Sequence, residues 1–128
     1  MNSVAVIGDT SAVVDYLYGR GSQAIEKAIR AETLILPPIV IAELLSGSDA
    51  PLRRAAIGEV LKDLPMHAVG RLHWIAVGNM RHDLKRHGLN VTIPDAHVAQ
   101  CALDLKAPLI TGDDIFRLIA QHIPLRLA

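Results

Sequence analysis

Two short stretches of the sequence each combine an apolar run, a glycine and an aspartate: VAVIGDTS near the start and PLITGDDI near the end. Continuous apolar runs of this kind predict strands that are buried on both faces, as in a parallel sheet. In open α/β sheets, ligands bind beyond the carboxyl ends of the strands. If the two strands are neighbours, Asp9 and Asp113 meet at one edge of the sheet. The glycine before each aspartate is expected to permit a tight backbone turn.

Two more carboxylates lie on apolar faces of predicted helices. Asp95 continues the helical stripe of Val98, Ala102 and Leu105, and Glu43 stands among the apolar residues of IVIAELLSG. Burying an unpaired charge is costly, and four carboxylates in one pocket repel one another, so a cation is expected among them. Oxygen donors suit Mg²⁺ or Mn²⁺. The chemistry that follows most directly is phosphoryl transfer, in which a metal-bound water attacks phosphorus.

Each of these carboxylates also has a purely structural interpretation. Asp9 and Asp113 could cap helices, and Asp95 could interact with a helix dipole. This alternative is weakest for Glu43, because a glutamate in mid-helix is usually exposed and this one is surrounded by apolar residues. The metal hypothesis therefore rests on the four carboxylates together.

Strands and helices are expected to alternate along the chain, which favours an α/β domain with a parallel sheet. Pro51 and Pro94 are expected to open helices, Thr92 to cap one, and Gly47 to end one. The predicted strands are residues 4–8, 33–37, 66–70, 108–111 and 123–127, and the predicted helices are residues 11–18, 22–31, 39–47, 51–64, 71–87, 94–106 and 113–121. These short, evenly spaced elements predict a single domain over residues 1–128.

Composition narrows the classes of protein further. The formal net charge is zero, from 13 basic and 13 acidic residues, which counts mildly against a passive nucleic-acid-binding module. Cys101 is the single cysteine, expected to be a small buried hydrophobe, and a chain without disulfides fits the cytoplasm. No signal peptide and no membrane span are expected. The six histidines show no compact ligand pattern, and His97 is interpreted as an exposed bystander beside Asp95.

The basic residues are weaker evidence for a function than the acidic residues are. In the stretch RHDLKRHG, Arg81, Lys85 and Arg86 could contact RNA phosphates. A solvated helix end, with cations favoured by the helix dipole, is the simpler interpretation. Arg53 and Arg54 are interpreted as surface charge.

Four motifs, VIGDTSAVVDYL, VIAELLSG, IPDAHVAQCAL and PLITGDDIF, resemble the PIN domain in order and spacing, in particular the VapC-type toxins of bacterial type II toxin–antitoxin systems. The resemblance covers nearly the whole chain. It implies a three-layer α/β/α sandwich with a central, mainly parallel sheet, and a divalent-metal-dependent endoribonuclease using Mg²⁺ or Mn²⁺. It assigns catalysis and metal binding to four acidic residues and a supporting role, holding water or positioning carboxylates, to three hydroxyls: Asp9, Glu43, Asp95 and Asp113, with Thr10, Ser11 and Thr111.

The resemblance also implies partners: an RNA substrate, a cognate small antitoxin whose tail enters the active-site groove, and a second copy of the chain in a homodimer. One position departs from the family pattern. The family often has a further Asp two residues after the fourth acid, where this chain has Ile115, and Asp114 stands one residue early. This departure from the family pattern leaves the role of Asp114 in metal binding open.

Two other classes of function stay open at the level of sequence. A phosphoryl-accepting α/β domain also places Asp after parallel strands, but the expected Asp-x-Asp, or acidic pair with a later Lys, is not evident. A catalytically inert PIN-like interaction module is the second alternative, and the complete set of four carboxylates disfavours it.

Overall fold

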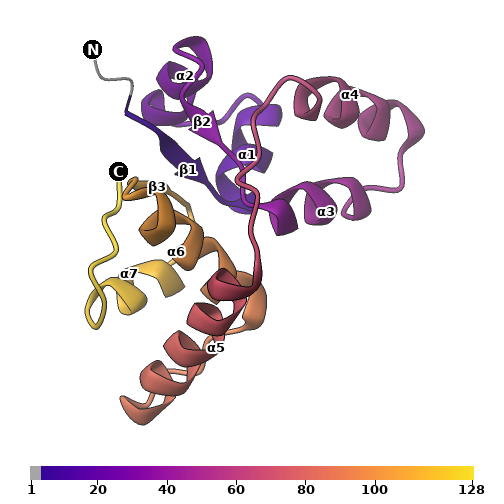
Figure 1. Cartoon of the computed structure of the whole chain (residues 1–128). Helices are drawn as coiled ribbons and strands as arrows, with labels where there is room; N and C mark the ends of the chain where they lie inside the picture. Colours follow the sequence, from indigo (N-terminus) through magenta and orange to yellow (C-terminus); the bar gives the residue numbers. More distant parts are fainter. Residues whose placement is uncertain (1–3) are drawn as a thin grey trace.

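The computed structural model describes residues 4–128, and a three-stranded parallel sheet stands at the centre of this part of the chain (Figure 1). The strands are β1 (Val6–Gly8), β2 (Leu34–Ile35) and β3 (Leu109–Ile110), in the order β2-β1-β3. Ile7 is paired with Ile35 on one side and with Leu109 on the other. The first strand of the sequence is therefore the central strand of the sheet, and the expected neighbours β1 and β3 are confirmed.

Helices form the two outer layers. The helix bounds are α1 (Thr10–Leu17), α2 (Gln23–Arg30), α3 (Pro38–Ser46), α4 (Pro51–Leu61), α5 (Arg71–Arg86), α6 (Ile93–Leu105) and α7 (Ile115–Ala120). The crossover from β1 to β2 carries α1 and α2, and the crossover that ends in β3 carries α6. Because these two crossovers run in opposite directions along the sheet, right-handed connections place their helices on opposite faces. The predicted three-layer α/β/α architecture is confirmed.

The helix starts follow local chemistry. Side chains of Asp9, Ser22 and Thr92 accept hydrogen bonds from backbone N–H groups at the starts of α1, α2 and α6. Pro38 and Pro51 occupy the first turns of α3 and α4, where a missing N–H costs nothing. The predicted helices all exist, with ends that differ by a few residues at most.

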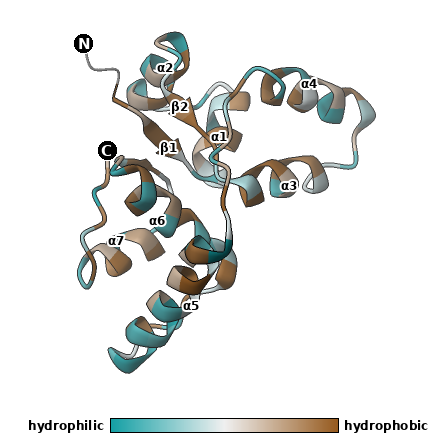
Figure 2. Cartoon of the chain, in the orientation of Figure 1, coloured by the Kyte–Doolittle hydropathy of each residue, from teal (hydrophilic) through white to brown (hydrophobic). Residues whose placement is uncertain are grey.

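The core lies between the sheet and the helices. Figure 2 shows β1 and β2 in brown, whereas the far end of α5 is teal. Burying an aliphatic side chain completely contributes about 1.5–3 kcal/mol each, so this interior supplies most of the driving force for folding. Large side chains that are almost fully buried include Ile7, Ile25, Leu34, Leu36, Leu84, Leu109, Phe116 and Ile119.

Two predicted strands are reduced to single bridges. Residues 66–70 pair only through Met66 with Leu36, and residues 123–127 only through Leu127 with Leu109. Pro65 directly precedes the first bridge and Pro124 lies three residues before the second, and a residue without an N–H shortens any ladder that it joins. Among residues 4–128, no helix has both the length and the hydropathy needed to span a bilayer.

Candidate functional site

Asp9 is the most tightly held of the four predicted acidic residues. It follows β1 directly and is the N-cap of α1, where its Oδ1 accepts hydrogen bonds from Ala12 N at 2.9 Å and from Ser11 Oγ at 2.8 Å. Its Oδ2 accepts a short hydrogen bond from Thr111 Oγ1. Only 5% of the residue is exposed. The capping interpretation is thus correct, and it leaves Asp9 at the sheet edge where the metal hypothesis needs it.

The chain after β3 reaches the same place. Gly112 N donates to Ser11 Oγ at 2.9 Å, and Asp113 N donates to Thr111 Oγ1 at 2.9 Å. The carboxylate of Asp113 is exposed, and its Oδ1 accepts from Ile115 N at 3.1 Å, at the start of α7. The two strand ends are therefore joined by hydroxyl groups, and the predicted meeting of Asp9 and Asp113 at one edge is confirmed.

The glycines before these aspartates have a different purpose from the one expected. Neither Gly8 nor Gly112 has a positive φ, so a left-handed backbone conformation does not explain the glycine at either position, although the chain bends at Gly112. A Cβ at Gly8 would lie 3.0 Å from Leu34 Cδ1, so the glycine there allows β2 and its side chain to approach the central strand closely. At Gly112 the nearest contacts would be at ordinary distances, 3.6 Å and beyond.

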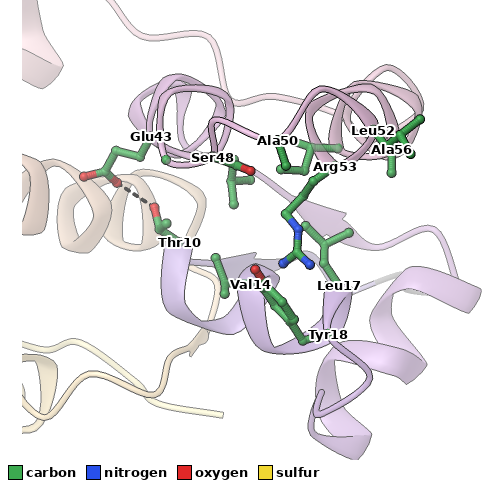
Figure 3. Close-up of a pocket in the computed structure, with 13 residues that line it drawn as sticks. Thr10, Val14, Leu17, Tyr18, Glu43, Ser48, Ala50, Leu52, Arg53 and Ala56 are labelled. Atoms are coloured by element: carbon green, nitrogen blue, oxygen red, sulfur yellow. Dashed lines mark hydrogen bonds between the residues drawn. The ribbon is translucent and has the colours of Figure 1, made fainter.

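Glu43 enters the site from α3. Thr10 Oγ1, on α1, donates to Glu43 Oε1 at 2.5 Å, and Figure 3 shows this hydrogen bond between the two helices. Glu43 is half-buried, in agreement with its apolar surroundings in the sequence. Consecutive hydroxyls of α1 thus orient two different carboxylates: Thr10 holds Glu43 and Ser11 holds Asp9.

Asp95 completes the group from the first turn of α6. Its backbone N–H donates to Thr92 Oγ1 at 3.2 Å, which confirms Thr92 as the cap. Below it, Val98 and Ala102 are buried, so the predicted inward stripe is confirmed. Burial raises the pKa of Asp95, and the negative charges of the other three carboxylates raise it further. Asp95 therefore lies within electrostatic reach of the other three predicted acidic residues.

The pKa of Asp9 is also raised, chiefly because burial disfavours its charged form. The hydrogen bonds from Thr111, Ala12 and Ser11 oppose this effect by stabilising the carboxylate, and the charge of Asp113 adds to it. A nearby cation would reverse the balance, since it favours the ionised form of every carboxylate around it.

The donor set fits a hard divalent metal. All four candidates offer carboxylate oxygens, which suit Mg²⁺ and Mn²⁺. Across residues 4–128, the one group of three acidic, histidine or cysteine donors within 4.8 Å of one another lies elsewhere, so these carboxylates are more widely spread. Mg²⁺ usually keeps several waters and takes only one or two carboxylates directly, so a wider spacing is compatible with it.

A groove of about 540 Å³ leads away from Glu43 between α1, α3 and α4. Its walls are mainly apolar, and Arg53 lies over the ring of Tyr18 with its guanidinium carbon 4.2 Å from the ring centroid (Figure 3). The interpretation of Arg53 as mere surface charge is therefore incomplete, because it stacks on an aromatic side chain beside the site. No sequence pattern pairs these residues, since they come from helices that meet only in the fold.

Two other expectations outside the four carboxylates can be compared with the structure. Asp114 is exposed and lies 3.8 Å from Arg117, which gives it a partner on its own helix. Arg81 Nε donates to Val91 O at 2.8 Å, so this arginine ties α5 to the segment before α6. That contact favours the structural interpretation of Arg81, whereas Lys85 and Arg86 are exposed at the helix end.

The expectation for His97 is wrong. It is completely buried, and its Nδ1 lies 2.7 Å from Nε2 of His73 on α5. Its ring also stacks on Trp74, with centroids 4.7 Å apart. Position 97 is two residues after Asp95, which turns it away from the acidic residues and toward α5. Cys101 is buried as expected.

The fold and the site define an α/β domain with four carboxylates at the carboxyl edge of a parallel sheet. A family model, the PIN domain, matches residues 6–121. The chain therefore belongs to the PIN domain family, and the resemblance seen in its motifs is confirmed.

Solved structures with the same fold come from several bacteria. The chain is similar to one in DNA-bound VapBC from Salmonella typhimurium, with a TM-score of 0.80, 21% identity and 98% of both chains covered. It is similar to one in VapBC2 from Rickettsia felis bound to promoter DNA, with a TM-score of 0.79, 20% identity and 98% of both chains covered. FitAcB from Neisseria gonorrhoeae matches with a TM-score of 0.72, 16% identity and 95% of both chains covered. None of the curated proteins compared matches the chain.

Proposed function

We propose that this PIN domain is a divalent-metal-dependent endoribonuclease and the toxin of a toxin–antitoxin pair. The observation that carries the proposal is the hydroxyl network at the sheet edge. Thr10 and Ser11 at the start of α1, and Thr111 just after β3, each donate to a predicted metal-binding carboxylate, so hydroxyls from two parts of the fold orient Asp9 and Glu43. A structural capping role requires only the hydrogen bond from Ala12 N to Asp9. The additional hydroxyls are expected where carboxylates must be oriented for chemistry.

In this mechanism Asp9, Glu43, Asp95 and Asp113 would hold one or more Mg²⁺ or Mn²⁺ ions. When bound, the metal supplies positive charge that polarises the scissile phosphate and acidifies water. Asp9 provides a rigid anchor, because both of its oxygens already accept hydrogen bonds from the protein. Asp113 is exposed, and in this mechanism it would orient a water molecule beside the phosphate.

The same geometry argues against a phosphoryl-accepting aspartate. Such an aspartate must present an oxygen to an incoming phosphodonor, and Asp9, which directly follows the first strand, is only 5% exposed. Hydrolysis by water, without a covalent phospho-enzyme, is therefore the reaction that we propose.

The groove and the structural relatives support the proposed partners. Similar chains occur in VapBC complexes, and another solved structure with this fold is a toxin–antitoxin complex from Klebsiella pneumoniae. We propose that a small antitoxin occupies the apolar groove and places a basic side chain among the carboxylates, where it displaces the metal. Residues 1–128 would form a single domain that pairs as a two-fold homodimer in the cytoplasm.

The decisive experiment is cleavage of total RNA by purified, antitoxin-free protein. Wild type is expected to cut RNA with Mg²⁺ or Mn²⁺, to stop when a chelator is added, and to recover when metal is restored. Asp95→Asn is expected to keep the fold and lose most of the cleavage, because a neutral amide is a poorer metal ligand.

Three outcomes would contradict the proposal. Cleavage that persists equally in Asp95→Asn and in chelator would come from a contaminating nuclease. Labelling of one aspartate by a small phosphodonor would establish a phosphoryl-accepting domain. Absence of both activities, in protein shown by circular dichroism to be folded, would favour an inert interaction module.

A further inference from the structure

We propose a second metal site, selective for a thiophilic divalent cation such as Zn²⁺, on His67, His73 and Cys101. Each of these residues offers one ligand atom, and the three atoms lie within 4.8 Å of one another. His67 belongs to the segment between α4 and α5, His73 to the first turn of α5, and Cys101 to α6. The site is independent of the proposed nuclease activity.

The spacing is close to that of a tetrahedral zinc site. Zinc binds histidine nitrogen at about 2.0–2.1 Å and cysteine sulfur at about 2.3 Å, which sets ligand atoms roughly 3.3–3.6 Å apart. Metal binding would draw these atoms together by about 1 Å from the observed limit. An imidazole–imidazole–thiolate set selects zinc over Mg²⁺, because soft sulfur is a poor ligand for a hard cation.

Asp104 supplies the outer support that such sites usually have. Its Oδ2 lies 2.5 Å from His73 Nδ1 and 3.2 Å from His67 Nε2. A histidine that donates one ring proton to a carboxylate presents its other nitrogen as a lone pair, which fixes the tautomer for metal binding. Gln100 Nε2 in turn donates to Asp104 Oδ1 at 2.8 Å, so the carboxylate itself is held in place.

Solvent can reach the cluster from one side, and a bound cation would change the contacts within it. The side chain of His67 is 18% exposed and that of Asp104 is 24% exposed, so solvent reaches one side of a group whose cysteine is buried. Occupancy would displace the thiol proton of Cys101 and interrupt the contact between His73 and His97. The bound cation would then join α5, α6 and the segment that precedes them.

The site is separate from the acidic pocket although both use α6. Cys101 follows Asp95 by six residues, which is about 9 Å along a helix axis, and it points to another side of the helix. A cation at one site can therefore be measured while the other is saturated with Mg²⁺.

The test is titration of the full chain with Co²⁺ in excess Mg²⁺, followed by competition with Zn²⁺. A thiolate ligand gives cobalt a sulfur-to-metal charge-transfer band, and carboxylates do not. The expected result is a band that saturates at one cobalt per chain, that Zn²⁺ removes, and that is lost in Cys101→Ser. Zn²⁺ is also expected to raise the melting temperature of wild type.

His67→Gln is the more informative variant. His67 is partly exposed, so this substitution is expected to leave the protein folded even if Cys101→Ser, at a buried position, unfolds it. Cobalt affinity is expected to fall by at least about tenfold in His67→Gln, and to stay unchanged in the control His82→Gln, an exposed histidine of α5. A missing sulfur band at all cobalt concentrations, or equal affinity in wild type and His67→Gln, would overturn the proposal.

Discussion

The molecule contains two polar clusters, and they offset the free-energy cost of burying polar groups in opposite ways. The first consists of the four carboxylates Asp9, Glu43, Asp95 and Asp113 at the sheet edge, whose charges raise the pKa of Asp95. The second is the histidine cluster between α5 and α6, defined as His67, His73, His97, Cys101 and Asp104. In the second cluster donors and acceptors alternate, and hydrogen bonds connect its members.

The two clusters differ in whether their members satisfy one another before any cation binds. Like charges at the sheet edge cannot satisfy one another, and the donors that residues 4–128 supply to Asp9 and Glu43 are neutral hydroxyl and N–H groups. In the histidine cluster, Asp104 accepts from two imidazoles, and the pKa of Asp104 is lowered although burial opposes this. We therefore expect the first cluster to carry the reaction and the second to hold helices together.

The largest expected effect comes from comparing one acid of each cluster. Asp9→Asn is expected to reduce RNA cleavage by about a hundredfold or more, because the anchoring carboxylate loses its charge. Asp104→Asn is expected to change cleavage far less and to lower the melting temperature instead. Initial cleavage rates and thermal melts of both variants measure the two effects, and a larger cleavage defect in Asp104→Asn would reverse the assignment.

The two clusters should also respond to acid with opposite signs. Burial lowers the pKa of His97 from 6.5 to about 4, so the unfolded state takes up that proton first. Stability supplied by neutral His97 is therefore present above pH 6.5 and lost as the pH falls toward 4. For Asp95 the folded-state pKa is raised, so acid protonates the folded state first and stability is gained below that pKa.

Urea unfolding in the presence of a chelator, at pH 6.5 and pH 4, measures both contributions. His97→Gln is expected to flatten the loss of stability on acidification. Asp95→Asn is expected to steepen it, because the compensating gain disappears. Parallel pH profiles for the two variants would show that neither group contributes as described.

A smaller effect is expected from the hydroxyl that orients Glu43. Thr10→Val keeps the shape of the side chain but removes the donor to Glu43 Oε1. Cleavage at limiting Mg²⁺ is expected to fall by about tenfold and to recover partly at high Mg²⁺. Thr33→Val is the matched control, because its hydroxyl donates to Ala28 O, away from the carboxylates. Equal rates for both variants would mean that Glu43 needs no such support.

The smallest effect is expected at Asp114. This residue is exposed and lies near Arg117, so Asp114→Asn should leave cleavage within about twofold of wild type. Asp113→Asn, one position earlier, is expected to impair cleavage strongly. Metal-dependent cleavage rates of the pair test whether the site ends at Asp113, and similar defects in both would extend it.

The acidic site was accessible from sequence because its signals are local. Asp9 and Asp113 each follow an apolar strand, and Asp95 tops an apolar helical stripe, so periodicity and strand ends predict where they lie. The hydroxyls Thr10, Ser11 and Thr111 were predicted through the family resemblance, and the hydrogen bonds of the structure confirm that they position carboxylates. Their roles in catalysis remain predictions.

The histidine cluster could not be predicted in the same way. His67, His73, His97 and Cys101 are spread over three segments, and only the packing of α5 on α6 brings them together. His97 looked exposed because it adjoins an acidic residue, whereas helix geometry turns it to the opposite side. The strands at 66–70 and 123–127 were overpredicted for a related reason, since composition does not show how many residues find a partner.

The order of strands in the sheet has a consequence for protein synthesis. Asp9 is made well before its partner Thr111, which lies 102 positions later. A nascent or truncated chain that ends before β3 lacks both Thr111 and Asp113, and therefore lacks the acidic pocket. If the protein degrades RNA, it cannot do so until β3 and the residues after it have been translated. A ribosome that stalls before that point would carry an inactive fragment.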